Sequence, residues 1–294
     1  MIEFKPRTWK ILSLSAIALV GLGGCGEGEA GDMAGKSAVS AGGATASAGE
    51  GEGEGAKVSP AAPTLAALSP NPNTGQSGES GEAGAANAYS AIPVTSQLGL
   101  RIAHVTGFLL IAQKAYAAGQ TDEASVLISQ GLLEVYRPEA AKLDVGAKGL
   151  QASFEAVVAA IDGKRPKAEI EAAFEAATTL ARAAEASSGA EAKDIVGGML
   201  SIAAGLYSGV VAPAGNDPIE YQHAQGAALG AKVAFDVSKS NLTEKNRMRT
   251  QALGKEIDTL LALFPTVNLP ETPASVAQVA AAASRAQLTL SGIR

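Results

Sequence analysis

Residues 91–294 contain no convincing run of alternating β-branched residues, and this pattern narrows the available folds more than any other feature of the chain. Alanine and leucine dominate the stretch, and both are strong helix formers. Its length, about 204 residues, suits one domain or two small domains packed closely together. The sequence therefore predicts an all-α fold: an up-and-down helical bundle, built as two halves of about four helices each.

Capping residues, glycines and prolines divide this stretch into separate helices. Gly119 is expected to end the first long helix, and Pro218 to open the sixth. Thr243 is the expected N-cap of the seventh helix, and Thr272 with Pro273 is expected to start the eighth. The expected helical ranges are 96–118, 121–136, a short piece at 138–144, 149–162, 166–187, 190–212, 218–238, 243–264 and a last helix from 272.

Two similar stretches contain the chain's two histidines. RIAHVTGFLLIAQKAY begins at Arg101, and EYQHAQGAALGAKVAF begins at Glu220. In both, the histidine is followed by glycine three residues on, leucine six on, alanine eight and eleven on, and then an aromatic residue. Because histidine is so rare here, the match indicates an internal duplication, with the two halves as pseudo-repeats.

The repeated frame leaves three interpretations of His104 and His223. On a helix the histidine, the glycine and the second alanine share one face, which favours a packing seam with each neutral imidazole bonded to a neighbouring helix. Alternatively, the two histidines meet across the bundle and hold a metal or small ligand, with help from Glu220, Glu134 or Tyr221. Surface histidines without a role are the third interpretation.

Residues 195–212, IVGGMLSIAAGLYSGVVA, carry no charge. A helix that is apolar all round is either a core helix or a membrane span. Four glycines and two serines make this one weakly hydrophobic, and basic residues do not flank it closely on both sides. A buried central helix is the favoured interpretation, and a membrane span is the alternative.

The N-terminus has the pattern of a secretory signal, with basic residues, an apolar run (ILSLSAIALVGLGG) and then Cys25. The sequence from Leu22 to Cys25, LGGC, resembles the lipobox of bacterial lipoproteins. The resemblance implies a signal peptide at 1–24 and an acylated Cys25 that anchors the protein in a lipid bilayer. Gly26, in place of aspartate, implies the outer membrane, with the body facing the periplasm or the cell surface. An ordinary signal peptide with a stray cysteine is the alternative.

Residues 25–90 read as a flexible tether rich in glycine, alanine, serine and glutamate. Residues 26–90 hold eight acidic residues and two lysines, and Tyr89 is their only aromatic residue. The acidic character of the protein therefore lies in the tether, and the near-neutral body at 91–294 gives no sign of nucleic-acid binding. Cys25 is the only cysteine in the chain, so the sequence predicts neither disulfides nor thiol chemistry in the body.

A lipobox, a low-complexity tether and an all-helical body with a histidine in its first long helix resemble the imelysin-type periplasmic lipoproteins. That resemblance implies two four-helix bundles and, for some members, a role in iron uptake. The family's Gly-x-His-x-x-Glu signature does not occur at His104, where residues 102–107 read IAHVTG. Iron binding is therefore not carried over to this chain.

The sequence gives little support for catalysis. It has no Gly-x-Ser-x-Gly nucleophile turn and no phosphate-binding loop, and only two histidines are available as general bases. We expect a non-catalytic envelope lipoprotein whose helical domain binds another envelope protein, with no cofactor. The alternative is an imelysin-like lipoprotein that binds a metal or small solute.

Overall fold

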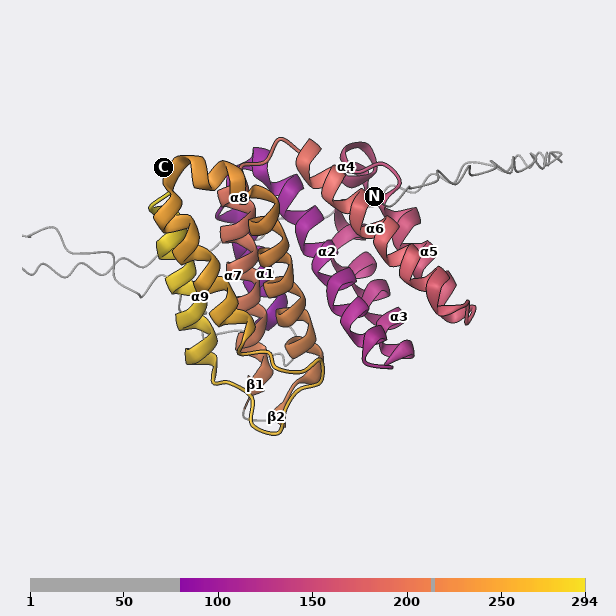
Figure 1. Cartoon of the computed structure of the whole chain (residues 1–294). Helices are drawn as coiled ribbons and strands as arrows, with labels where there is room; N and C mark the ends of the chain where they lie inside the picture. The colour runs from indigo at the N-terminus through magenta and orange to yellow at the C-terminus, as the bar shows by residue number, and fades with distance from the viewer. Residues whose placement is uncertain (1–79, 213–214, 294) are drawn as a thin grey trace, which may run out of the picture. The chain divides into compact units, whose positions relative to one another are not determined.

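The computed structural model describes residues 80–212 and 215–293, and these residues confirm the all-α fold (Figure 1). The signal peptide, Cys25 and tether residues 26–79 lie outside the described residues. The helices are α1 (Ser80–Ser90), α2 (Val94–Ala117), α3 (Thr121–Gln130), a π-helix η2 (Gly131–Tyr136), a 3-10 turn η3 (Arg137–Glu139), α4 (Ala140–Gly146), α5 (Leu150–Asp162), α6 (Lys167–Ser187), α7 (Ala192–Val210), α8 (Pro218–Leu261) and α9 (Val276–Ser291).

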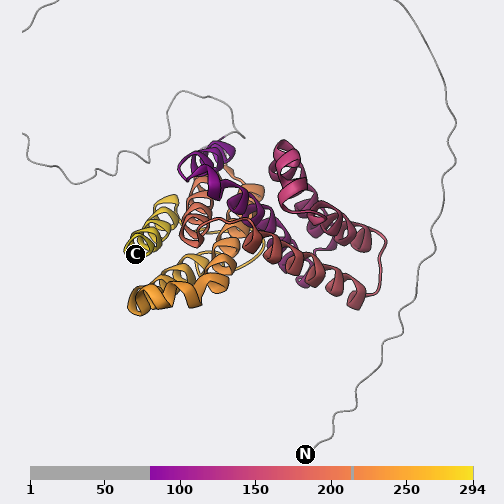
Figure 2. The same ribbon diagram turned by 90° about the horizontal axis from the view of Figure 1, so that it is seen from above.

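The apolar side chains form two clusters, so the helices divide into two bundles. The first, called here the α3–α6 bundle, has a core from α2, α3, α5 and α6 with the short α4 beside them. The second, the α7–α9 bundle, has a core from α1, α7, α8 and α9. Figure 1 shows α9 and α8 on one side and α3, α5 and α6 on the other, and Figure 2 shows the same division from above. The internal duplication remains a prediction.

Helix α2 connects the two bundles. It packs against α3 and α6 on one side and against α7 and α8 on the other. It is also the one helix among the described residues that is long and apolar enough to cross a membrane by length and composition, and 67% of its most apolar 18-residue window is buried. That burial is expected of a core helix. Helix α7, which includes most of the uncharged stretch, likewise places ten residues in the interior.

Helix α8 is two helices joined by a sharp kink at Asn246, whose backbone leaves the helical region. Beyond the kink, the Asn246 side chain accepts a hydrogen bond from the amide of Arg249, so asparagine caps the new helix. The expected cap at Thr243 is therefore wrong by three residues. The Thr243 hydroxyl instead donates to the carbonyl of Lys239, one turn back.

The last helix also begins three residues later than the expected start at Thr272 and Pro273. Ser275 caps α9: its hydroxyl accepts from the amide of Gln278, and the Gln278 side chain accepts from the amide of Ser275. This reciprocal pair is a capping box, and it satisfies two backbone donors at once.

The folded domain starts earlier than residue 91. Residues 80–90, assigned above to the tether, form α1, which packs along α7. Ala85 and Ala88 are buried there, 8% and 3% exposed. A second departure is small: β1 (Val211–Ala212) and β2 (Gly215–Asn216) pair as a short antiparallel hairpin between α7 and α8.

Candidate functional site

The two repeated stretches cross each other at their shared glycine. A methyl group placed on Gly107 of α2 would lie 2.7 Å from the carbonyl oxygen of Gly226 on α8. The reverse substitution would place a methyl 2.9 Å from the carbonyl oxygen of Gly107. No real side chain tolerates such distances to a backbone atom, so both positions require glycine. We call this contact the His–Gly crossing.

Both histidines contact one aromatic ring at this crossing. The ring centroid of Phe108 is 5.5 Å from that of His104 and 4.7 Å from that of His223, both in tilted arrangements. The histidine side chains are 4% and 7% exposed. The two similar stretches therefore bring their histidines to the same phenylalanine ring.

Each imidazole bonds to a different neighbouring helix. The Nδ1 atom of His104 is 2.6 Å from the hydroxyl of Tyr89 on α1. The Nε2 atom of His223 lies 3.3 Å from Oε1 of Gln130 at the end of α3, which accepts from the ring. This is the arrangement that the packing-seam interpretation requires, with one bond from each histidine to another helix.

Burial keeps both rings neutral. The pKa of His104 is lowered to about 3, mainly by burial and to a smaller extent by the nearby His223 and Arg101. Burial lowers the pKa of His223 to about 4, while the charge of Asp217 acts weakly in the opposite direction. Neither ring is therefore charged near neutral pH, and the crossing carries no net positive charge.

The other residues of the ligand-site interpretation are only partly brought together. Glu134 approaches His223, with 3.9 Å between its Oε2 and the ring Nδ1, and Glu220 lies on the same face of α8 one turn earlier. Tyr221 does not join them, because its hydroxyl donates to the carbonyl of Thr266 at 3.0 Å. Within residues 80–212 and 215–293, no group of three or more His, Cys, Asp or Glu side chains is placed to hold a metal ion.

The π-helix η2 lies next to the crossing and was not foreseen. It starts at Gly131, where a Cβ atom would lie 2.6 Å from Cβ of Phe108, so the glycine lets α2 approach. The wider turn carries Glu134 towards His223. π-helical turns occur often at functional sites. The 121–136 stretch contains a glycine in mid-helix, and that glycine was the available signal.

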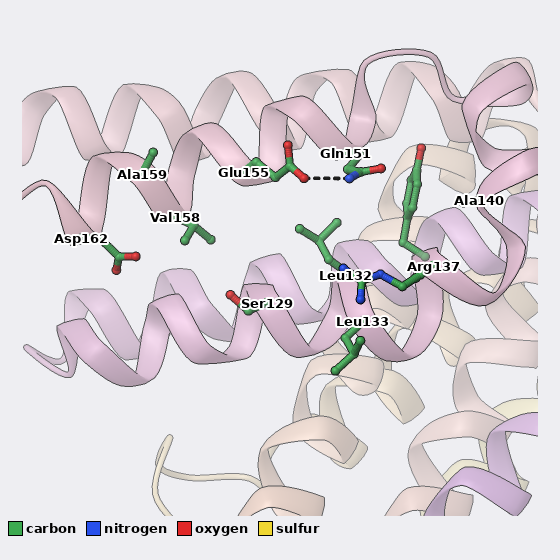
Figure 3. Close-up of a pocket in the computed structure, with 11 residues that line it drawn as sticks. Ser129, Leu132, Leu133, Arg137, Ala140, Gln151, Glu155, Val158, Ala159 and Asp162 are labelled. Atoms are coloured by element: carbon green, nitrogen blue, oxygen red, sulfur yellow. Dashed lines mark hydrogen bonds between the residues drawn. The ribbon is translucent and has the colours of Figure 1, made fainter. Parts of the chain in front are cut away.

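A groove of about 430 Å³ opens on the side of the α3–α6 bundle, between the α3–η2 segment and the antiparallel α5 (Figure 3). Leu132 points towards α5, and Val158 points back towards α3. The groove lining comprises Ser129, Leu132, Leu133, Tyr136, Arg137, Ala140, Gln151, Glu155, Val158, Ala159 and Asp162.

The groove lining combines apolar and polar side chains in about equal measure. Glu155 and Asp162 are exposed on α5, and Arg137 is exposed on the opposite wall. The Glu155 carboxylate accepts from Gln151 at 2.7 Å, and that of Asp162 accepts from the Ser125 hydroxyl at 2.7 Å. These bonds hold both acids in place on the α5 wall.

Leu133 lies at the edge of the groove with 54% of its surface exposed. An exposed leucine beside a groove lined by both apolar and polar side chains is typical of a binding surface. Sequence reasoning missed the groove, because its floor combines side chains from two helices whose pairing the sequence does not state.

Comparisons with known proteins return no match to this chain among protein-family models, curated proteins or solved structures.

Proposed function

We propose that this chain is a lipid-anchored protein of the bacterial envelope, and that its helical domain is a non-catalytic binding module. Cys25 anchors the protein in the outer membrane, and residues 26–79 connect the anchor to the domain. The groove between α3–η2 and α5 binds the partner. The exposure of Leu133 beside a groove lined by both apolar and polar side chains is the observation that carries the binding role.

The anchor rests on Cys25, the chain's only cysteine, at the end of the apolar N-terminal run. Cys25→Ser should release the protein from membranes or block its processing, because no acyl chain can be attached. Fractionation of cells and intact-mass analysis of the mature protein measure both effects. A mature N-terminus at another residue, without acyl chains, would show that the lipoprotein assignment is wrong.

The groove fits one class of partner best, an amphipathic helix of another envelope protein. Such a helix would place apolar side chains on Leu132, Leu133 and Val158. The α5 wall carries Glu155 and Asp162, so a basic residue on that side of the partner helix would find complementary charge. Arg137 on the opposite wall favours an acidic residue there.

Leu133→Glu should reduce recovery of the partner at least tenfold when the anchored protein is purified from detergent-solubilised envelopes after mild crosslinking. The change adds a charge to an apolar contact but leaves the fold intact, since the side chain is already exposed. Leu288→Glu is the matched control, because Leu288 is 73% exposed on α9, outside the groove, and should change nothing. Equal recovery with both variants would remove the groove as the binding surface.

One observation favours a second function, binding of a metal or small solute in the manner of the imelysin-like lipoproteins. The Glu134 carboxylate lies 3.9 Å from His223, and Glu220 precedes His223 by one turn of α8. Carboxylate and imidazole groups on facing helices can build such sites in bundles. Elemental analysis of the purified protein distinguishes the two functions: about one equivalent of iron, copper or zinc, lost in His223→Gln, would support the second.

A further inference from the structure

Helix α1 has little stability of its own. Its eleven residues, SGEAGAANAYS, include two glycines, which weaken a helix, and isolated helices of this length are marginal in water. Within residues 85–90, Ala85 and Ala88 are the buried residues, and both have small side chains. The helix therefore depends on its docking against α7 for its own stability.

Tyr89 attaches α1 to α2 through three contacts. Its hydroxyl shares a 2.6 Å hydrogen bond with Nδ1 of His104. Its ring lies under the guanidinium of Arg101, 4.1 Å from the ring centroid, and its carbonyl accepts from the Gln97 side chain at 3.0 Å. These contacts fix the C-terminal end of α1, and Ala85 and Ala88 are buried in the core that α1 shares with α7.

His104 lies directly behind this attachment. Tyr89 supplies the hydrogen bond to Nδ1, while Nε2 of His104 is buried without a hydrogen-bond partner among the described residues. Such an atom loses its hydration without compensation. Departure of Tyr89 would break the Nδ1 bond and remove a side chain that contacts the ring, and we expect water to take its place.

The chain around α1 suits detachment. The connection to α2 is only residues 91–93, and Pro93 is the N-cap of α2, so α2 can keep its start when α1 leaves. Residues 26–79 lead directly into α1 from the other side. Any pull along the chain from the N-terminal side therefore reaches α1 before the other described helices.

We propose that α1 is a detachable strap, which leaves its seat on α7 as a unit while α2 to α9 stay folded, and which uncovers His104 when it leaves. Detachment itself does not depend on the lipid anchor. The proposed function enters only as the source of the pull, so a soluble Cys25→Ser protein should show the same opening as the anchored one.

Hydrogen exchange on the full chain in detergent tests the strap. In the wild type, the amides of residues 80–90 should exchange faster than those of α2 and α7, because α1 opens without global unfolding. Tyr89→Phe should speed exchange in residues 80–90 by about tenfold, the factor expected for one hydrogen bond to a buried group, and leave α2 and α7 unchanged. Ser90→Ala is the control, since Ser90 bonds only within α1.

Chemical modification of the histidines gives an independent readout. Diethyl pyrocarbonate acylates accessible neutral imidazoles, so Tyr89→Ala should raise the modification rate of His104 at least tenfold while His223 stays protected. Two outcomes overturn the proposal. In the first, residues 80–90 exchange at the same rate as α2 and α7 in every variant; in the second, α1 exchanges faster but the reactivity of His104 does not rise.

Discussion

Gly107→Ala is expected to destabilise the protein by about 2–3 kcal/mol, and Gly107→Leu to prevent folding. The reason is the His–Gly crossing, where a methyl on Gly107 would lie 2.7 Å from a backbone oxygen of α8. Backbone atoms cannot rotate away as a side chain can, so the two helices must separate. Gly226→Ala should behave in the same way. Chemical denaturation followed by circular dichroism measures the change.

Gly197→Ala is the matched control for this prediction. Gly197 lies within α7, and a methyl there would meet only the Leu290 side chain at 3.4 Å, an ordinary contact. Alanine is a better helix former than glycine, so this variant should keep or gain stability, by up to about 1 kcal/mol. The same chemical change should therefore have opposite signs at the two positions. Wild-type stability in Gly107→Ala would contradict the crossing.

The free energy of unfolding should fall as the pH is lowered from about 6.5 to about 4. Unfolded histidine titrates near 6.5. In the folded protein the pKa is about 3 for His104 and about 4 for His223. Between these values the unfolded chain binds two protons that the folded chain cannot bind. Each histidine then removes roughly 1.4 kcal/mol of stability per pH unit.

One carboxyl group acts in the opposite direction. Burial raises the pKa of Glu185 to about 7, so the folded chain takes up this proton before the unfolded chain does, and acidification from pH 7 to 4.5 adds stability.

Substitution of each histidine isolates its contribution to the pH dependence of stability. His104→Gln and His223→Gln should be less stable than wild type at pH 7, by about 1–3 kcal/mol, and should lose less stability towards pH 4.5. Parallel curves for wild type and variants would contradict neutral, buried rings.

The helical pattern of the body followed from the sequence because alanine, leucine and the helix-breaking residues act locally. Gly119, for example, follows α2 with a φ of +83°, a conformation that suits glycine. The sequence predicts a new helix capped by Thr243, three residues before the kink in α8 at Asn246, because threonine and asparagine are both acceptable caps. In the folded chain Thr243 bonds back to Lys239, and only Asn246 is free to cap.

The candidate site was predictable only in part. The shared frame of the two histidines predicted a helix contact at their glycines, and the crossing of Gly107 and Gly226 is that contact. The partners of the rings were not predictable, because Tyr89 and Gln130 come from other helices. Tyr89 stood out as the only aromatic residue of the supposed tether, and that signal indicated that the folded domain begins before residue 91.

The most direct test of the His–Gly crossing is nuclear magnetic resonance of the imidazole nitrogens in the full chain labelled with 15N-histidine. The sequence has only two histidines, so each signal belongs to one of two residues. Both rings should remain neutral, each as a single tautomer, from pH 8 down to the onset of acid unfolding. A ring that takes up a proton between pH 6 and 7 in the folded protein would contradict the buried crossing of α2 and α8.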